Sequence, residues 1–419
     1  MSSALPSYAE AAALVARHAA ALSRFRPAIE RVDLLHAAGR VLAQPLVADT
    51  DQPPFSRSTR DGFACRADDA NRHAPLVLAG AARAGDAPSG PLPPAAAWEI
   101  MTGAPVPSGA DAVLMLEHVE TARATVRLLP PRTVKPGENI VAQGVQARQG
   151  DPLLAPGVVL RPGQIALAAA LGYAALDVFA RPRVAILTTG DELVPIHATP
   201  APGQIRNSNA PMLAALVAEA GGDPWLLPTA HDNPASLDAA LAQALTADLL
   251  LISGGVSAGK FDLVEPALAR LGATFHFTGV RIQPGKPTVF GELPVPSAKS
   301  VREQHRTKCF FGLPGNPVSS AVTFLLFAAP ILAALTGIRE TWPRFALARF
   351  APPADRHAKP GLTRFLPAAC TFGSDPQAAF VPWHGSGDLG ALAASNCFLV
   401  VPEEAATLHP GDPVQILLP

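Results

Sequence analysis

The chain has 419 residues, enough for two to four domains at about 150 residues per domain. Its 33 Lys and Arg nearly balance its 34 Asp and Glu, so a net charge of -1 gives no global attraction to nucleic acid or to an anionic membrane. Hydrophobic residues make up 49% of the chain, which excludes an intrinsically disordered protein.

The spacing of the cysteines and histidines matches no pattern typical of a metal site or of a disulfide-linked fold. The four cysteines lie far apart, at Cys65, Cys309, Cys370 and Cys397. The sequence contains no Cys-x-x-Cys and no His-Glu-x-x-His. We therefore expect neither a structural zinc site of a known spacing nor a disulfide-stapled fold.

The apolar stretches are too short or too interrupted to cross a membrane. The nearest candidate, Ala321–Leu335, contains Thr323 and Pro330, whereas a spanning helix needs about 20 apolar residues. Charges such as Glu10 and Arg17 interrupt the alanine-rich N-terminus, which favours an amphipathic helix over a secretory leader. The sequence predicts a cytoplasmic protein with neither a membrane nor a nucleic-acid partner.

Periodicity divides the first half of the chain into helical and strand-like parts. Helical spacing predicts helices over Tyr8–Leu22, Val32–Leu46 and Gly163–Leu171. Between them, residues 55–135 carry short apolar pieces separated by proline and glycine, a pattern typical of a small β domain. We expect a helical domain built from two segments, with the β domain inserted between them.

From Arg183 the pattern becomes alternating strand and helix. Runs that are apolar on both faces, such as Val184–Leu187 and Leu249–Ile252, alternate with helical stretches and predict a doubly wound, parallel α/β sheet covered on both sides. A long helix is expected over Pro317–Leu335, and only short strands after Trp342. The predicted multidomain α/β division is 1–52 with 141–180, then 53–140, 181–336 and 337–419.

Residues 292–308 interrupt the α/β unit. They contain Pro-Val-Pro and a cluster of basic and acidic side chains. Mixed charges of this kind usually lie in water, so we expect a solvated, dispensable loop.

Ligands of a doubly wound sheet bind beyond the carboxyl ends of its strands. The first such turn, Thr188–Glu192, places Asp191 and Glu192 at a strand tip, where they can hold Mg²⁺, act as acid and base, or simply favour a helix N-terminus. The second, Ser253–Asp262, exposes backbone N–H groups that can cradle a phosphate, and it adds the Asp262 carboxylate.

The second turn also matches Gly-x-x-x-x-Gly-Lys from Gly254 to Lys260. A P-loop needs Ser or Thr after the lysine, and Phe261 stands there, which argues against a nucleoside-triphosphate hydrolase. In the third turn, Gly312–Ser320, Asn316 can cap a helix that begins with proline and attracts anions. Lys286, in a proline-rich turn, suits a phosphate or another oxyanion.

Eight segments carry a resemblance that covers nearly the whole chain. They are Pro53–Ala64, Ile100–Pro107, Val134–Ile140, Thr189–Leu193, Ser253–Ser257, Pro284–Pro287, Gly312–Ser319 and Gly385–Leu389. In this order they resemble the molybdopterin molybdenumtransferase (molybdenum insertase) family, which also includes the C-terminal domain of gephyrin. The resemblance implies a helical domain, an inserted β domain, a molybdopterin-binding α/β domain and a C-terminal β barrel.

The resemblance also implies a reaction, in which adenylylated molybdopterin and molybdate yield molybdenum cofactor and AMP with the help of Mg²⁺. It implies a homodimer, with a molybdopterin-adenylylating donor enzyme and molybdoenzyme acceptors as partners. The implied catalytic residues are Asp61, Thr102, Glu192, Asp262 and Lys286. The implied cofactor-binding residues are Thr189, Gly190, Ser253, Gly254, Gly255, Ser257, Pro284, Gly285, Pro314, Gly315, Asn316 and Pro317. The metal ligands expected are Asp191, Glu192 and Asp262.

Four positions depart from the family's usual pattern: Arg60, Phe63, Gln146 and Gln283. Two alternatives stay open. One is the preceding step, adenylylation of molybdopterin, whose α/β domain is similar; the additional β domains favour insertion. The other is a scaffold role, against which the intact Glu192, Asp262 and Lys286 argue.

Overall fold

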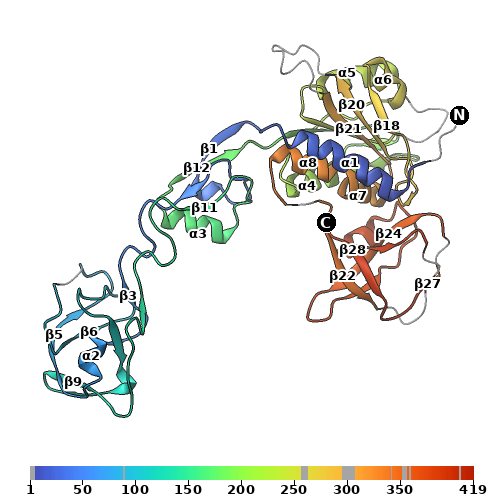
Figure 1. The fold of residues 1–419 in the computed structure, drawn as a ribbon. Helices are drawn as coiled ribbons and strands as arrows, with labels where there is room; N and C mark the ends of the chain where they lie inside the picture. Colours follow the sequence, from blue (N-terminus) through green and yellow to red (C-terminus); the bar gives the residue numbers. More distant parts are fainter. Residues whose placement is uncertain are drawn as a thin grey trace.

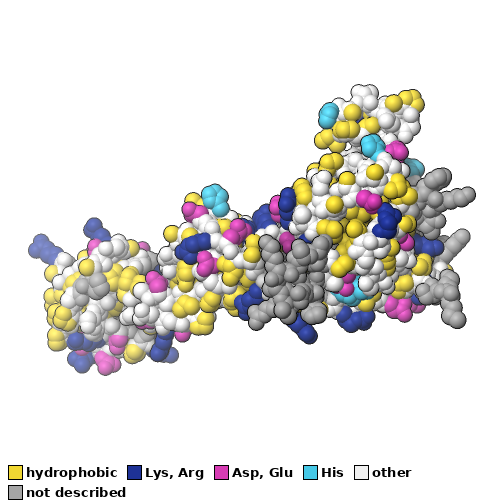
Figure 2. Space-filling model, turned by 90° about the horizontal axis from the view of Figure 1, so that it is seen from above, with side chains coloured by type: hydrophobic (Ala, Val, Ile, Leu, Met, Phe, Trp, Pro, Cys, Tyr) yellow, Lys and Arg dark blue, Asp and Glu magenta, His cyan; other side chains and the backbone are white. Residues whose placement is uncertain are grey.

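The computed structural model describes residues 5–87, 90–255, 263–294, 307–340, 342–351, 356–357, 360–404 and 407–419. The chain forms an elongated molecule (Figure 1). A small β module, built around strands β4 to β9, lies at one end, and the α/β unit and the C-terminal strands lie at the other. Basic and acidic side chains are intermixed along the face shown in Figure 2.

The N-terminal helix α1 (Tyr8–Leu22) is confirmed, and it belongs to the α/β unit. Ser7 and Glu10 form a capping box at its start, each side chain bonding the other's backbone N–H. Ala11 and Val15, on one face of α1, are buried in the core shared with α8 (Ala329–Thr336).

The second predicted helix, over Val32–Leu46, is wrong. That region begins with strand β1 (Ile29–Asp33), which pairs with β12 (Ala175–Phe179). It continues as the 3-10 turn η1 (Leu34–His36) and ends where β2 (Leu46–Val47) pairs with β11 (Pro152–Leu154). Because both partners follow the inserted module in the chain, a local helical period could not reveal these pairs. The third predicted helix is confirmed as α3 (Pro162–Ala170).

The inserted module is a twisted sheet with the strand order β7-β4-β6-β5-β9-β8. Buried side chains that include Phe63, Leu76 and Leu114 form its core. Strands β3 and β10 pair at its base. The elements are β3 (Arg57–Ser58), β4 (Gly62–Cys65), α2 (Ala67–Ala70), β5 (Leu76–Ala82), β6 (Ala96–Ile100), β7 (Ala112–Met115), η2 (Leu116–His118), β8 (Val119–Ala122), β9 (Thr125–Leu128) and β10 (Ile140–Val141).

The α/β unit contains a sheet with the strand order β16-β13-β17-β21-β20-β18. Separate apolar clusters cover its two faces, one under α1, α4 and α8 and one under α5 and α6, as predicted. The elements are β13 (Arg183–Thr188), β14 (Leu193–Val194), β15 (Ile205–Arg206), α4 (Asn209–Glu219), β16 (Asp223–Leu226), α5 (Pro234–Ala244), β17 (Leu249–Ser253), α6 (Val264–Arg270), β18 (Thr274–Phe277), β20 (Val289–Pro294) and β21 (Thr307–Leu313).

The predicted parallel sheet has an antiparallel edge. Strands β16, β13, β17 and β21 run parallel, but β20 and β18 are antiparallel to their neighbours. Strand β20 follows the buried turn at Thr288 without a crossover helix, so it enters the sheet from the opposite end.

The predicted loop over 292–308 is wrong at both ends. Glu292 lies in β20 and Lys308 in β21, where they continue the antiparallel ladder. Glu292 accepts a hydrogen bond from Thr307 and lies 3.1 Å from His276 Nε2, so it is not a free solvated charge. Residues 295–306 lie outside the described residues.

The long predicted helix is confirmed as one continuous helix, Pro317–Thr336. It consists of α7 (Pro317–Thr323), the π-helical turn Phe324–Ala328 and α8. By length and composition it could cross a membrane, but 94% of its most apolar window is buried inside the protein. A buried core helix passes the same composition test.

The C-terminal strands close into a barrel of β24, β25, β22, β28 and β26, because β24 also pairs with β26. Strand β24 (Thr363–Thr371), the longest of these strands, was not predicted from the sequence, since Pro367 reads as a strand breaker. The other elements are β19 (Ile282–Gln283), β22 (Phe345–Phe350), β23 (Arg356–His357), β25 (Gln377–Phe380), α9 (Leu389–Ala394), β26 (Cys397–Val401), β27 (Thr407–Leu408) and β28 (Pro413–Leu417). All four cysteines are buried free thiols.

Candidate active site

A cavity of about 540 Å³ lies beyond the carboxyl ends of β13, β17 and β21. The strand register puts Thr188 beside Ser253 and Ser253 beside Leu313, so the three predicted turns meet at one edge. The lining residues are Thr188, Thr189, Glu192, Leu193, Pro200, Gln204, Ile205, Arg206, Asn207, Ser208, Asn209, Ser253, Gly254, Gly315, Asn316, Pro317, Gly387 and Leu389.

Glycine is required where the first two turns cross. Gly254 has φ +93°, and a Cβ there would lie 2.7 Å from the carbonyl oxygen of Thr189. A Cβ on Gly255 would lie 2.8 Å from Thr189 Oγ1, and one on Gly190 would meet the carboxylate of Glu192. Without these side chains the backbone of β17 approaches that of β13 closely and leaves the cavity floor open.

Asn209, which was not predicted as a site residue, links two of the turns. Its side-chain amide donates to Ser253 Oγ at 2.9 Å and to the carbonyl oxygen of Gly315 at 2.6 Å. Both Asn209 and Ser253 are buried. Two paired buried donors fix these turns relative to each other.

A second amide supports the first turn. Asn207 Nδ2 donates to Thr188 Oγ1 at 2.9 Å and to Thr229 Oγ1 at 3.3 Å. The available signal was the polar run Asn207–Asn209 at the start of an apolar helix, since uncharged polar residues at that place either cap the helix or serve a site.

Two buried oxygen atoms of the cavity wall have no hydrogen-bond partner within the described part of the chain. They are Thr189 Oγ1 and Asn209 Oδ1. Buried polar atoms are rarely left unpaired, and both residues line the cavity. A ligand that carries hydrogen-bond donors would satisfy them.

The two neighbouring carboxylates diverge. Glu192 lines the cavity, whereas Asp191 does not. Asp191 Oδ1 lies 3.0 Å from His231 Nδ1 and accepts from the N–H of Asp232, and these bonds lower the pKa of the Asp191 carboxyl group. Glu192 therefore fits a Mg²⁺ ion, which typically takes one or two carboxylates together with substrate phosphates; the structure does not bring Asp191 to the same place.

In the third turn, Asn316 has the position of a helix cap but does not cap with its side chain. No side-chain bond to the helix start is formed, and Asn316 Nδ2 instead donates to Ser386 Oγ at 2.8 Å. The N–H of Val318 donates to the carbonyl of Ser386. The segment Gly385–Leu389 thereby docks on the start of the long helix, and its Gly387 and Leu389 close one side of the cavity.

The turn that carries Lys286 lies outside the cavity lining. The carbonyl oxygen of Lys286 accepts a hydrogen bond from the N–H of Val280, and the Lys286 side chain is exposed. Gly285 packs against Thr323 of α7. The neighbouring Gln283 accepts a hydrogen bond from Arg364 at 2.9 Å, so a guanidinium stands beside it.

Asp61 and Thr102 meet in the inserted module. The backbone N–H and the hydroxyl of Thr102 both donate to Asp61 Oδ1, at 2.7 and 2.8 Å, and they lower the pKa of the Asp61 carboxyl group. In Figure 1 this module and the α/β unit occupy opposite ends of the molecule. One chain does not bring Asp61 to the cavity that Glu192 lines. Ser257, Lys260 and Asp262 lie outside the described residues.

Comparison with known proteins agrees with this architecture. Residues 6–172 match the MoeA N-terminal region (domain I and II), 185–334 match a probable molybdopterin binding domain, and 352–418 match the MoeA C-terminal region (domain IV). A molybdopterin molybdenumtransferase from Nostoc sp. is 36% identical over 93% of this chain and 88% of its own. The chain belongs to this family. It is thus a transferase of molybdenum cofactor biosynthesis.

Another relative and a crystal structure support the assignment over the whole length. The molybdopterin molybdenumtransferase of Haemophilus influenzae is 33% identical over 92% of this chain and 93% of its own. The molybdopterin biosynthesis MoeA protein of Pyrococcus horikoshii OT3 superposes with a TM-score of 0.80 at 28% identity, over 99% of this chain and 100% of that one. The multidomain α/β fold with its C-terminal barrel is the family's fold.

Proposed function

We propose that the chain inserts molybdate into adenylylated molybdopterin and releases AMP in a Mg²⁺-dependent reaction. The cavity beyond β13, β17 and β21 carries this proposal. Its volume of about 540 Å³ falls in the usual range of small-molecule sites. It combines glycine turns, a helix start and one carboxylate around the same space, the set that a phosphorylated substrate requires.

Different residues of the cavity bind different parts of the substrate. The hydroxyl hydrogen of Ser253 and the positive dipole end of the long helix at Pro317 would face phosphate oxygens. The N–H groups of Gly254 and Val318 are already bonded to the carbonyl oxygens of Leu313 and Ser386. Asn209 holds the turns at Ser253 and Gly315 in register. The unpaired Thr189 Oγ1 and Asn209 Oδ1 accept hydrogen bonds from N–H groups of the substrate.

Glu192 would hold Mg²⁺ from the protein side, with Asp262 as the second expected ligand. When bound, a divalent cation neutralises phosphate charge during phosphoanhydride cleavage. Asp191 is a poorer candidate, because its carboxylate is already engaged by His231. Lys286, and Arg364 beside Gln283, supply positive charge for an oxyanion outside the cavity lining.

We further propose that the working enzyme is a two-fold homodimer. Asp61 and Thr102 form one polar pair far from the cavity of their own chain (Figure 1). If the Asp61–Thr102 pair and the cavity residues act in one reaction, the β module of one copy has to reach the cavity of another copy. A two-fold contact would generate two equivalent sites of this kind.

The test is incubation with adenylylated molybdopterin, molybdate and Mg²⁺, with AMP measured by chromatography. The proposal predicts AMP release and molybdenum cofactor formation, and the loss of both when Mg²⁺ is chelated. Formation of adenylylated molybdopterin and pyrophosphate from ATP and molybdopterin alone would assign the preceding adenylylation step instead. Binding of molybdopterin without any turnover would favour a scaffold role.

A further inference from the structure

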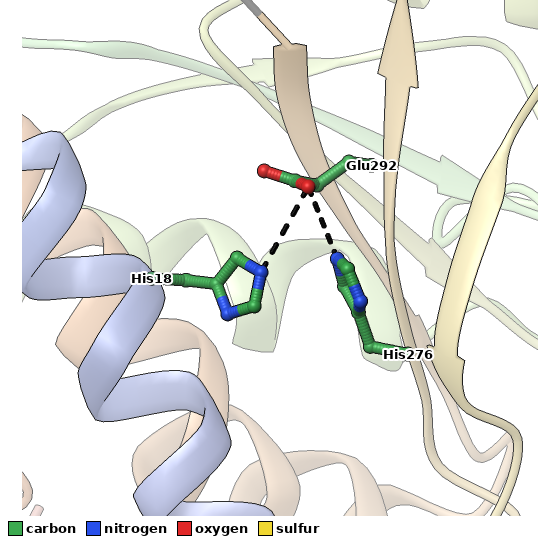
Figure 3. A group of neighbouring side chains, drawn as sticks. All are labelled: His18, His276 and Glu292. Atoms are coloured by element: carbon green, nitrogen blue, oxygen red, sulfur yellow. Dashed lines mark hydrogen bonds and ion pairs between the residues drawn. The ribbon is translucent and has the colours of Figure 1, made fainter.

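Three polar side chains from distant parts of the chain meet at the antiparallel edge of the α/β sheet (Figure 3). They are His18 on α1, His276 on β18 and Glu292 on β20, and none of them lines the cavity described above. His276 Nε2 lies 3.1 Å from Glu292 Oε2, and His18 Nε2 lies 3.8 Å from the same oxygen. We infer that this cluster binds a divalent transition metal of the zinc type and thereby fastens α1 to the sheet.

The spacing suits a small tetrahedral ion. All three candidate ligand atoms lie within 4.8 Å of one another. Ligands held about 2.0–2.2 Å from a zinc ion in a tetrahedron are about 3.4 Å apart. The two measured separations bracket that value, so an ion needs only small side-chain adjustments to enter.

Hydrogen bonding decides which nitrogen of His18 is free. Its Nδ1 lies 2.9 Å from the carbonyl oxygen of Leu14, which can only accept, so Nδ1 carries a proton. In the neutral ring, Nε2 then presents a lone pair toward the carboxylate of Glu292. Two facing acceptors repel unless a metal ion or a proton lies between them. Histidine ligands of metals commonly donate their other N–H to a backbone carbonyl in this way.

The other two groups are also prepared as ligands. His276 falls at a register shift in the ladder between β18 and β20, and such bulges redirect side chains. In Figure 3 its ring is turned toward Glu292. Thr307 Oγ1 donates to Glu292 Oε1 at 2.8 Å, which leaves Oε2 for the shared contact.

The surroundings hold the three side chains in place. They are only 17–21% exposed. The two imidazole rings lie 4.3 Å apart, and each ring is 5.1 Å from Phe290. A rigid site loses little freedom on binding. Two imidazole nitrogens and one carboxylate oxygen match Zn²⁺ better than Mg²⁺, which prefers oxygen ligands and octahedral geometry.

The test is equilibrium dialysis of the chelator-treated full chain against Zn²⁺, with excess Mg²⁺ present to occupy carboxylate sites. We expect one tightly bound Zn²⁺ per chain. His18→Ala and Glu292→Gln should each weaken that binding by at least about tenfold, and His36→Ala, at an exposed histidine outside the cluster, should not change it. Glu292→Gln preserves side-chain shape, so it tests the site even if His18→Ala loosens α1.

Two further readouts locate the ion. Co²⁺ in place of Zn²⁺ should produce the visible absorption of a tetrahedral site in the wild type and not in Glu292→Gln. Zn²⁺ should also slow backbone hydrogen exchange in α1 of the wild type alone. If Zn²⁺ binds equally well to His18→Ala and Glu292→Gln, or does not bind the wild type, the three groups form only a hydrogen-bonded cluster and the inference is wrong.

Discussion

Asn209 and Ser253 are 44 residues apart in sequence, and the amide of Asn209 donates to the hydroxyl of Ser253 at 2.9 Å inside the protein. The same amide donates to the carbonyl oxygen of Gly315. One side chain therefore sets the distance between the turns after β17 and β21. The shape of the cavity depends on a residue that belongs to neither turn.

We predict that Asn209→Ala weakens molybdopterin binding and lowers stability. Both donors of the amide are lost, which leaves Ser253 and Gly315 without their partner. Leaving buried groups unpaired costs about 1–3 kcal/mol. Calorimetric binding and a denaturant titration measure the two effects.

The matched control is Asn233→Ala. Asn233 caps α5 by accepting from the N–H of Ser236, and it does not line the cavity. Its loss should cost about 1 kcal/mol of stability and leave binding unchanged. Equal binding by the two variants would show that Asn209 has no role in the cavity beyond stability.

Gly254→Ala should damage both folding and binding. The new Cβ would lie 2.7 Å from a backbone oxygen at φ +93°, so the turn after β17 has to move. We expect a loss of more than about 1 kcal/mol in the free energy of unfolding. Gly163→Ala, in α3 with no atom within 4 Å of the added Cβ, serves as the control and should be neutral or stabilising.

Glu192→Gln should slow AMP release and weaken its dependence on Mg²⁺, because Glu192 is the one carboxylate among the described residues that line the cavity. Asp191→Asn should have a much smaller effect on both, since His231 and Asp232 already engage that side chain. Steady-state AMP release over a Mg²⁺ titration separates the two. Equal losses would mean that Asp191 turns toward the metal during the reaction.

Thr102→Ala should raise the pKa of the Asp61 carboxyl group. The hydroxyl donor is lost and the backbone donor stays, so the pKa should move only part of the way toward its ordinary value. The pKa of the Asp61 carboxyl group is lower in the folded protein than in the unfolded chain. Any stability from this carboxylate is therefore fully present above the pKa of the unfolded state, and it is lost as pH falls through the pKa of the folded state. Loss should therefore begin at higher pH in the variant.

Carboxyl carbon chemical shifts followed by NMR measure this titration directly. Thr121→Ala, at an exposed threonine of β8 in the same module, is the control and should leave the midpoint of Asp61 unchanged. An unchanged midpoint in Thr102→Ala would mean that the backbone bond alone lowers the pKa.

Local patterns predicted the elements whose partners lie nearby or whose burial is complete. The runs at Val184 and Leu249 are apolar on both faces and became central strands. The segment from Val32 to Leu46 failed because its partners come after the inserted module, about a hundred residues or more along the chain. Pro367 hid β24, since the strand tolerates proline only where its N–H is not needed.

The turns of the candidate site were predicted from the sequence, but the side chains that hold these turns in place were not. The glycines around Ser253 carry a recognisable signal, whereas Asn207 and Asn209 stand at the start of α4, where polar residues commonly cap helices without serving a site. Likewise, no spacing motif joins His18 to His276, because the contact between α1 and β18 exists only in the folded chain.

The claim that one site needs two copies is tested most directly by mixing two inactive variants. Asp61→Ala removes the group in the β module, and Glu192→Ala removes the group in the cavity. After complete subunit exchange of an equal mixture, half of the dimers are mixed and one of the two sites in each is intact. AMP release should then recover to about one quarter of the wild-type rate. No recovery, with exchange demonstrated by mass spectrometry, would contradict a shared site.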